Sequence, residues 1–273
     1  MSGARGRSRV HAFTLIELLV VIAVVAVLLG LMVPSLTGAR DAGRAVSCLS
    51  NQRQLVTAWM LYAGDHAGRA MPLGDARSSV EAFYWWGSVT GSPTRVDHER
   101  GFLSAYLASG LHARSVYECA AQPWGTYRPQ PAAVPAPGAP TSTYGYNGYY
   151  LSPAMTPGWN LEIGCQPWKR LADIERPGEL LVFADTLLPG APARNCALLD
   201  PPWLFSSASG WRWNDSPTTS FRHGTGACIS ARADGGARKV QGRAEWWVAR
   251  ELRIGSIGDC NDPAYVPDWR RWR

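Results

Sequence analysis

Charge is scarce in this sequence and is nowhere concentrated. Charged residues make up 18% of the 273 positions, the formal net charge is +6, and no run of five like charges occurs. Proteins that bind nucleic acid by neutralising phosphates need a dense basic patch. We therefore expect no nucleic-acid partner.

The sequence also lacks the short motifs that mark common catalytic sites. It contains no H-E-x-x-H, G-x-S-x-G, P-loop or EF-hand pattern. The sequence therefore predicts a protein that is not an enzyme and that needs no cofactor for catalysis.

Paired cysteines of the C-x-x-C type are absent, which excludes a zinc ribbon and a thioredoxin-type motif. The six cysteines are instead widely spaced, an even set that favours disulfides if the domain is exported. Six buried thiols are the alternative, since cysteine packs well as a small apolar group. The spacing does not select a pairing among Cys48, Cys119, Cys165, Cys196, Cys228 and Cys260.

Apolar and aromatic residues, by contrast, are plentiful. Hydrophobic residues make up 46% of the chain, and there are 13 Trp and 10 Tyr. A chain of this length and composition can bury a core of one large or two small domains. We therefore expect a globular body, with low complexity confined to a proline-rich surface loop over residues 129–140.

The longest apolar run covers residues 13–33, and its only charge is Glu17. As a helix the run is about 31 Å long, enough to cross the hydrocarbon core of a membrane. A cleaved signal peptide has a shorter apolar region, of about 7 to 15 residues. Arg5, Arg7 and Arg9 precede the run, so the amino terminus is expected in the cytoplasm and everything after Val33 outside.

Counted from the residue before it, the apolar run begins Ala12-Phe13-Thr14-Leu15-Ile16-Glu17. This segment resembles the processing site of type IV pilins and type II secretion pseudopilins. This resemblance implies that a prepilin peptidase and methyltransferase cuts between Ala12 and Phe13 and methylates the new amine. It also implies that Glu17 pairs with the Phe13 amine of a neighbouring subunit. Ala12 departs from the family pattern, which usually has Gly before the cut.

The resemblance extends beyond the membrane segment. Pro34 stands where such helices often kink, and a proline removes one helix hydrogen bond there. Leu36 to Tyr62 continues as a predicted helix that ends near residue 65, before Gly68. Its apolar stripe, expected to lie on a sheet, consists of Val46, Leu49, Arg53, Val56 and Met60.

Further landmarks look like those of a large bacterial subgroup of pilin-like proteins. They are the segments 48–55, 62–65, 117–119, 142–147 and 177–185, and a carboxyl-terminal His, Asp-Gly signature. In the subgroup nine residues separate His from Asp-Gly, whereas ten separate His223 from Asp234 and Gly235 here. The role of this signature does not follow from the resemblance.

The remaining patterns predict the fold. Residues 179–186 form an apolar strand, and the runs 227–233 and 237–241 flank Asp234-Gly235-Gly236 as a hairpin with a type I′ turn. The expected class is α+β, a long amino-terminal helix packed on an antiparallel sheet. The expected organisation is a leader (1–12), an assembly helix (13–33), an amphipathic helix (34–65) and an extracytoplasmic globular domain (66–273).

Three candidate sites lie in the globular part. His223 near Asp185 and Asp234 offers a base or a metal ligand, although a structural role is favoured. Asp259, Asn261 and Asp262 offer oxygens for calcium, although they match no defined calcium loop. Trp246 and Trp247, together with Trp269, Trp272 and nearby arginines, form either a binding surface or ordinary packing.

The leading hypothesis is a structural subunit that is processed at Phe13, anchored in the cytoplasmic membrane and assembled with other pilin-like subunits, in a type IV pilus or a secretion pseudopilus. Membrane lipid and the processing peptidase are its other expected partners. The first alternative is a tethered binding module that recognises a carbohydrate or a protein through Trp246 or Trp269. The second is an anchored hydrolase that uses His223 and Asp185.

Overall fold

The computed structural model describes residues 14–75, 81–90, 95–107, 115–122, 142–151, 169–190, 193–206 and 210–268. The chain groups into two units, residues 1–42 and 43–273. The leader 1–12, Phe13, Cys165, the proline-rich loop, Trp269 and Trp272 lie outside the described residues. The predicted α+β class is confirmed: a long helix precedes a domain of antiparallel sheets.

Helix α1 runs from Leu15 to Asp65 without interruption and passes through Pro34. Whether Pro34 bends it stays a prediction. The helix ends where the sequence predicted, because the Gly68 amide donates to the Ala63 carbonyl at 2.8 Å. Gly68 has φ +75°, a left-handed conformation that glycine adopts at little cost and that is common just beyond helix ends.

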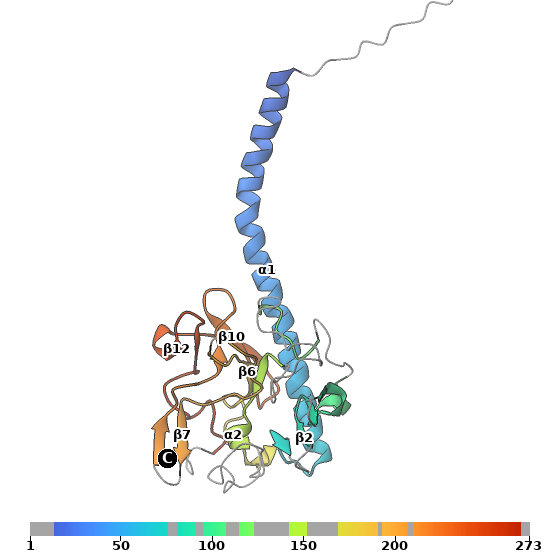
Figure 1. The fold of residues 1–273 in the computed structure, drawn as a ribbon, viewed down its shortest axis with the longest axis vertical. Helices are drawn as coiled ribbons and strands as arrows, with labels where there is room; N and C mark the ends of the chain where they lie inside the picture. Colours follow the sequence, from blue (N-terminus) through green and yellow to red (C-terminus); the bar gives the residue numbers. More distant parts are fainter. Residues whose placement is uncertain are drawn as a thin grey trace, which may run out of the picture. The chain divides into compact units, whose positions relative to one another are not determined.

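Among the described residues, the strands of the globular unit pair into four antiparallel sheets. Figure 1 labels at least one strand of each sheet: β2, β6 and β10, β12, and β7. The first has the order β1-β2-β3-β4, and the central one has the order β11-β10-β6-β5. A third sheet has the order β12-β13-β9, and β7 and β8 form a separate hairpin. The strands are β1 (Gly74–Asp75), β2 (Glu81–Tyr84), β3 (Gly87–Thr90), β4 (Arg95–Asp97), β5 (Tyr144–Tyr146), β6 (Leu181–Asp185), β7 (Trp203–Ser206), β8 (Gly210–Trp213), β9 (Thr219–Ser220), β10 (Ala227–Arg232), β11 (Ala237–Gln241), β12 (Trp247–Ala249) and β13 (Ile254–Gly255).

Short helical segments connect these strands. They are the α-helix α2 (Gly148–Leu151) and the 3-10 helices η1 (His98–Arg100), η2 (Ser104–Tyr106), η3 (Leu171–Asp173) and η4 (Ala244–Trp246). The Asp97 side chain caps η1 by accepting a hydrogen bond from the Glu99 amide at 2.9 Å.

The predicted hairpin is confirmed, since β10 pairs with β11 over Ala227 to Ala231. The predicted type I′ turn is wrong. The Gly235 amide donates to the Arg232 carbonyl at 3.0 Å, and Gly235 has φ +83°, whereas Asp234 is not at positive φ. Asp234 instead accepts a hydrogen bond from the Gly236 amide through Oδ1, at 2.8 Å. A side-chain bond of this kind stabilises a turn that needs only one left-handed residue.

Both faces of the central sheet are buried over β5, β6 and β10. On one face, Tyr144, Tyr146, Phe183 and Ile229 belong to the same core cluster as residues of α1. On the other face, Ala184 and Cys228 belong to a second core cluster, which includes Phe221, Tyr150 and Tyr265. The sheet is therefore the middle layer of the globular unit, between the carboxyl-terminal part of α1 and the carboxyl-terminal strands.

The predicted stripe of α1 is partly wrong. Val46 is 64% exposed and Met60 is 39% exposed, whereas Val56 is fully buried. The residues that face the core are Ala45, Cys48, Gln52, Leu55, Val56, Ala58, Trp59, Tyr62 and Ala63. Hydropathy did not indicate the buried Gln52, whose amide donates to the Ile229 carbonyl of β10 at 3.5 Å.

Trp59 joins α1 to the central sheet through a buried hydrogen-bonded chain. Its indole N–H donates to the Tyr146 hydroxyl at 3.2 Å, and that hydroxyl donates to the Met71 carbonyl at 2.7 Å. Trp59, Met71 and Tyr146 are completely buried. Removal of the central hydroxyl would leave a donor and an acceptor without partners, which is costly in a protein interior.

We therefore expect Tyr146→Phe to lower the free energy of unfolding by about 1 to 3 kcal/mol. Tyr106→Phe is the matched control, because the Tyr106 hydroxyl donates to Asp65 at an exposed site. It should cost less than about 0.5 kcal/mol. Urea unfolding of the full chain in detergent measures both, and equal losses would contradict the importance of the buried chain.

Candidate functional site

The first turn of α1 contains a capping box. The backbone amide and the hydroxyl of Thr14 both donate to Glu17 Oε2 at 2.8 Å, and the Glu17 amide donates to Thr14 Oγ1 at 3.2 Å. This reciprocal arrangement satisfies amides that otherwise have no partner at a helix start. Sequence reasoning missed it, although T-x-x-E before an apolar run is its usual signal.

The amino-terminal part of α1 is apolar on all sides and does not pack in the structure. None of its most apolar 18-residue window is buried, and the mean hydropathy of that window is 3.0. Leu15, Ile16 and Leu31 are more than 70% exposed. A helix that is hydrophobic all round is stable in a membrane or inside an assembly.

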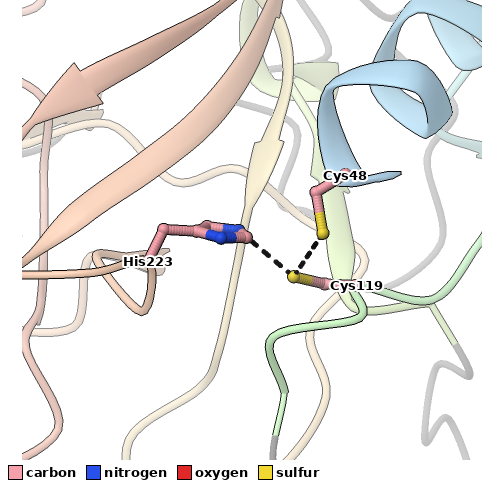
Figure 2. A group of neighbouring side chains, drawn as sticks. All are labelled: Cys48, Cys119 and His223. Atoms are coloured by element: carbon pink, nitrogen blue, oxygen red, sulfur yellow. Dashed lines mark hydrogen bonds between the residues drawn. The ribbon is translucent and has the colours of Figure 1, made fainter. Parts of the chain in front are cut away.

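A second site lies inside the globular unit, where Cys48, Cys119 and His223 converge (Figure 2). Cys48 Sγ lies 3.0 Å from Cys119 Sγ, and His223 Nε2 lies 3.3 Å from Cys119 Sγ. The same His223 nitrogen lies 3.1 Å from Asp185 Oδ2. We call these four residues the buried cluster, because none of them is more than 2% exposed.

Each member of the buried cluster is held by a different part of the fold. Cys48 lies on the core face of α1, and Asp185 is the last residue of β6. Cys119 is held against β5, because its amide donates to Thr143 Oγ1 at 2.6 Å. His223 begins a turn in which its own amide and the Ala227 amide each donate to the other residue's carbonyl at 2.8 Å.

The pKa shifts follow from these contacts. Burial lowers the pKa of His223, but the hydrogen bonds to Asp185 and Cys48 outweigh it and raise that pKa to about 9. The Cys119 thiol is a hydrogen-bond partner of the Cys48 sulfur, which lowers the pKa of Cys48. Burial and the same contact raise the pKa of Cys119. The cluster therefore favours a cationic His223 between the Asp185 carboxylate and the Cys48 sulfur.

The buried cluster does not have the geometry of a catalytic triad. In a triad the carboxylate binds Nδ1 and leaves Nε2 to face the nucleophile. Here Asp185 and Cys119 both face Nε2, and Nδ1 has no hydrogen-bond partner among the described residues. Burial also keeps substrates from the sulfurs. The cluster brings His223 and Asp185 together as predicted, but it does not favour the anchored hydrolase.

One comparison with known proteins gives a match at the amino terminus. A family model described as the prokaryotic N-terminal methylation motif matches residues 7–33. The chain carries a prepilin-type methylation motif. The match includes Ala12, Phe13 and Glu17, the residues on which the resemblance to pilins rests, and together with the apolar helix it indicates membrane anchoring. Searches of curated proteins and of solved structures found no match.

Beyond the methylation motif, the structure gives spatial meaning to the sequence landmarks. Cys48, Cys119 and Asp185 come from three of the landmark segments, and His223 comes from the carboxyl-terminal signature. Thr143, from a further landmark, positions Cys119. The buried cluster is thus the meeting point of these segments, which sequence spacing alone did not indicate.

The other half of the signature lies elsewhere. Asp234 and Gly235 form the turn after β10, whereas His223 pairs with Ala227 at the start of that strand. Asp234 accepts hydrogen bonds from Gly236 and Arg238. His223 and Asp234 therefore lie at opposite ends of β10. The carboxylate in contact with His223 is that of Asp185.

The candidate calcium residues are engaged with protein groups. The Asn261 amide accepts from the Trp203 amide through Oδ1 and donates to the Tyr150 hydroxyl through Nδ2. Asp262 forms an ion pair with Arg176, and the Asp259 carbonyl accepts from the Trp203 indole. The side chains of Asn261 and Asp262 thus have protein partners, and calcium binding stays a prediction.

The remaining cysteines are separate from the buried cluster. Cys228 lies in the second core cluster, Cys196 donates to the Leu198 carbonyl, and Cys260 is exposed. Among the described residues, all five cysteines are present as free thiols. The predicted disulfides stay a prediction, and Cys48 with Cys119 is the pair whose sulfurs are close.

The tryptophans before the tail contribute to packing. Trp246 and Trp247 are partly buried, and their ring centroids each lie 6.4 Å from that of Phe221. Arg243 and Arg253 lie over their rings, at 5.2 and 6.0 Å. This arrangement agrees with the packing interpretation, and the binding-module alternative stays a prediction.

Double-mutant cycles test which carboxylate acts with His223. His223→Ala and Asp185→Ala should show a coupling free energy of about 1 kcal/mol or more, because the two side chains are in contact. His223→Ala and Asp234→Ala should be additive within about 0.5 kcal/mol. Urea unfolding of the single and double variants measures both, and stronger coupling to Asp234 would overturn the assignment.

Proposed function

We propose that the protein is a prepilin-like structural subunit. A prepilin peptidase cuts it between Ala12 and Phe13 and methylates the Phe13 amine. The helix 13–33 anchors it in the cytoplasmic membrane and then joins it to other pilin-like subunits in a type IV pilus or a type II secretion pseudopilus. The observation that carries this proposal is the coincidence of the methylation motif, at residues 7–33, with the unburied apolar part of α1.

The charge distribution supports an orientation with the globular unit outside the cytoplasm. Arg5, Arg7 and Arg9 precede the apolar run, and no acidic residue lies among the first twelve. Positively charged flanks stay on the cytoplasmic side of a membrane. In the proposed orientation the cleavage site lies on the side where the peptidase of the resembled family acts.

Glu17 supports assembly through the same helix. A carboxylate inside a membrane costs up to about 2.5 to 3.5 kcal/mol, less near a helix end, so it is expected to have a specific partner. Within one subunit, Thr14 is that partner. After cleavage, the Phe13 amine of a neighbouring subunit supplies a cation in its place, which sets the register of the two helices.

Two variants separate these roles of Glu17. Glu17→Ala removes the charge and the carboxylate half of the capping box, whereas Thr14→Ala removes the hydroxyl half and keeps the charge. We expect Glu17→Ala to insert in the membrane but to reduce assembled subunits at least about tenfold, since a loss of 1.4 kcal/mol per contact already gives that factor. Thr14→Ala should assemble to within about twofold of the unaltered chain.

Sheared filaments and cross-linked oligomers are quantified by immunoblot, with the membrane fraction as the control for insertion. Equal loss in both variants would show that helix capping, not charge pairing, limits assembly. Normal assembly of Glu17→Ala would contradict the proposed pairing.

A further inference from the structure

We propose that the buried cluster is a binding site for one transition-metal ion of the zinc class, with Cys48, Cys119 and His223 as ligands and Asp185 as the fourth. The two sulfurs and the His223 nitrogen all lie within 4.8 Å of one another. They come from α1, from the segment 115–122 and from the turn before β10. The site is independent of the processing at Phe13.

The donor types match that class of ion. Two thiolates with imidazole and a further ligand form the tetrahedral shells that Zn²⁺ prefers, at about 2.3 Å to sulfur and 2.0 to 2.1 Å to nitrogen. Such a shell places two sulfurs about 3.8 Å apart and sulfur and nitrogen about 3.6 Å apart. The corresponding distances here are 3.0 and 3.3 Å. An expansion of less than about 1 Å would therefore admit the ion.

The contact between His223 Nε2 and Asp185 Oδ2 indicates that Asp185 is the fourth ligand. Nε2 donates a hydrogen bond to Asp185 Oδ2, at 3.1 Å. When an ion binds Nε2 and the two sulfurs, that proton and any proton still held by the sulfurs leave to solvent, and Oδ2 then faces the metal. The Ile229 amide donates to Oδ2 at 2.6 Å and holds it in place. Asp185 Oδ1 has no hydrogen-bond partner among the described residues.

Arg222 compensates the net negative charge that the proposed ligands would leave on the occupied site. Two thiolates and one carboxylate around a divalent cation leave one negative charge. The Arg222 guanidinium donates to the Thr143 carbonyl at 3.2 Å, and the hydroxyl of the same threonine accepts from the Cys119 amide. The permanently charged Arg222 guanidinium is therefore connected to the ligand Cys119 through Thr143. A buried setting strengthens its attraction to the negative charge of the ligands.

A disulfide between Cys48 and Cys119 would use the two sulfurs but not the histidine. His223 Nε2 faces both Cys119 Sγ and the completely buried Asp185 carboxylate. An ion at this point would use the histidine nitrogen as well as the two sulfurs. His223 is therefore the residue whose substitution distinguishes the two cases.

Native mass spectrometry and elemental analysis of the full chain, purified in detergent without chelator, test the proposal. We expect one equivalent of metal, and alkylation of both Cys48 and Cys119 after denaturation. Reduced, chelator-treated protein should then take up one equivalent of Co²⁺ and show the absorption bands of a tetrahedral cobalt thiolate site. A metal-free chain that contains the Cys48–Cys119 disulfide, or a reduced chain that takes up no Co²⁺, would overturn the proposal.

Variants assign the ligands. Asp185→Ala should weaken Co²⁺ binding by at least about 10-fold, and His223→Ala by at least about 100-fold. Cys228→Ser is the matched control, because Cys228 is an equally buried thiol in the other core cluster. It should leave binding unchanged. Co²⁺ binding that survives His223→Ala would overturn the assignment, and if that variant does not fold, the cobalt spectrum of the unaltered chain decides.

Discussion

The packing of one face of α1 on the central sheet is the constraint on which the rest of the structure depends. Trp59 and Val56 are fully buried in that interface, and complete burial of a large apolar side chain contributes roughly 1.5 to 3 kcal/mol. The same contact fixes the rotation of the helix about its axis. Cys48, three turns before Trp59, consequently faces the core beside Cys119 and His223.

One helix thus serves two environments. Its carboxyl-terminal part has a single buried face, which belongs to the core of the globular unit. Its amino-terminal part is apolar all round and carries the methylation motif. A membrane or a bundle of like helices stabilises the second kind of surface, whereas a sheet stabilises the first. The two parts of α1 therefore differ in the surroundings that stabilise them, although they belong to one continuous helix.

The sequence predicted the elements with strong local signals. Helical periodicity and the glycine that follows it predicted the end of α1 near Asp65. An apolar run predicted β6, and Asp-Gly between two strand-like runs predicted the hairpin β10–β11. Two local details were wrong: the turn type at Asp234 and part of the buried stripe. Gln52 and Cys48 are on the core face because of long-range partners, Ile229 and Cys119, which no pattern within a helix can reveal. The sequence named both Asp185 and Asp234 as candidate partners of His223, but the choice of Asp185 depends on how separate strands meet.

Cleavage before Phe13, despite Ala12 in place of the usual Gly, is the step on which the proposed function depends. The most direct measurement is the intact mass and amino-terminal sequence of the protein from membranes of a host with its own prepilin peptidase. We expect a chain that begins with N-methylated Phe13. A chain that still carries Ala12 and the residues before it, or one that begins beyond Pro34, would contradict this expectation.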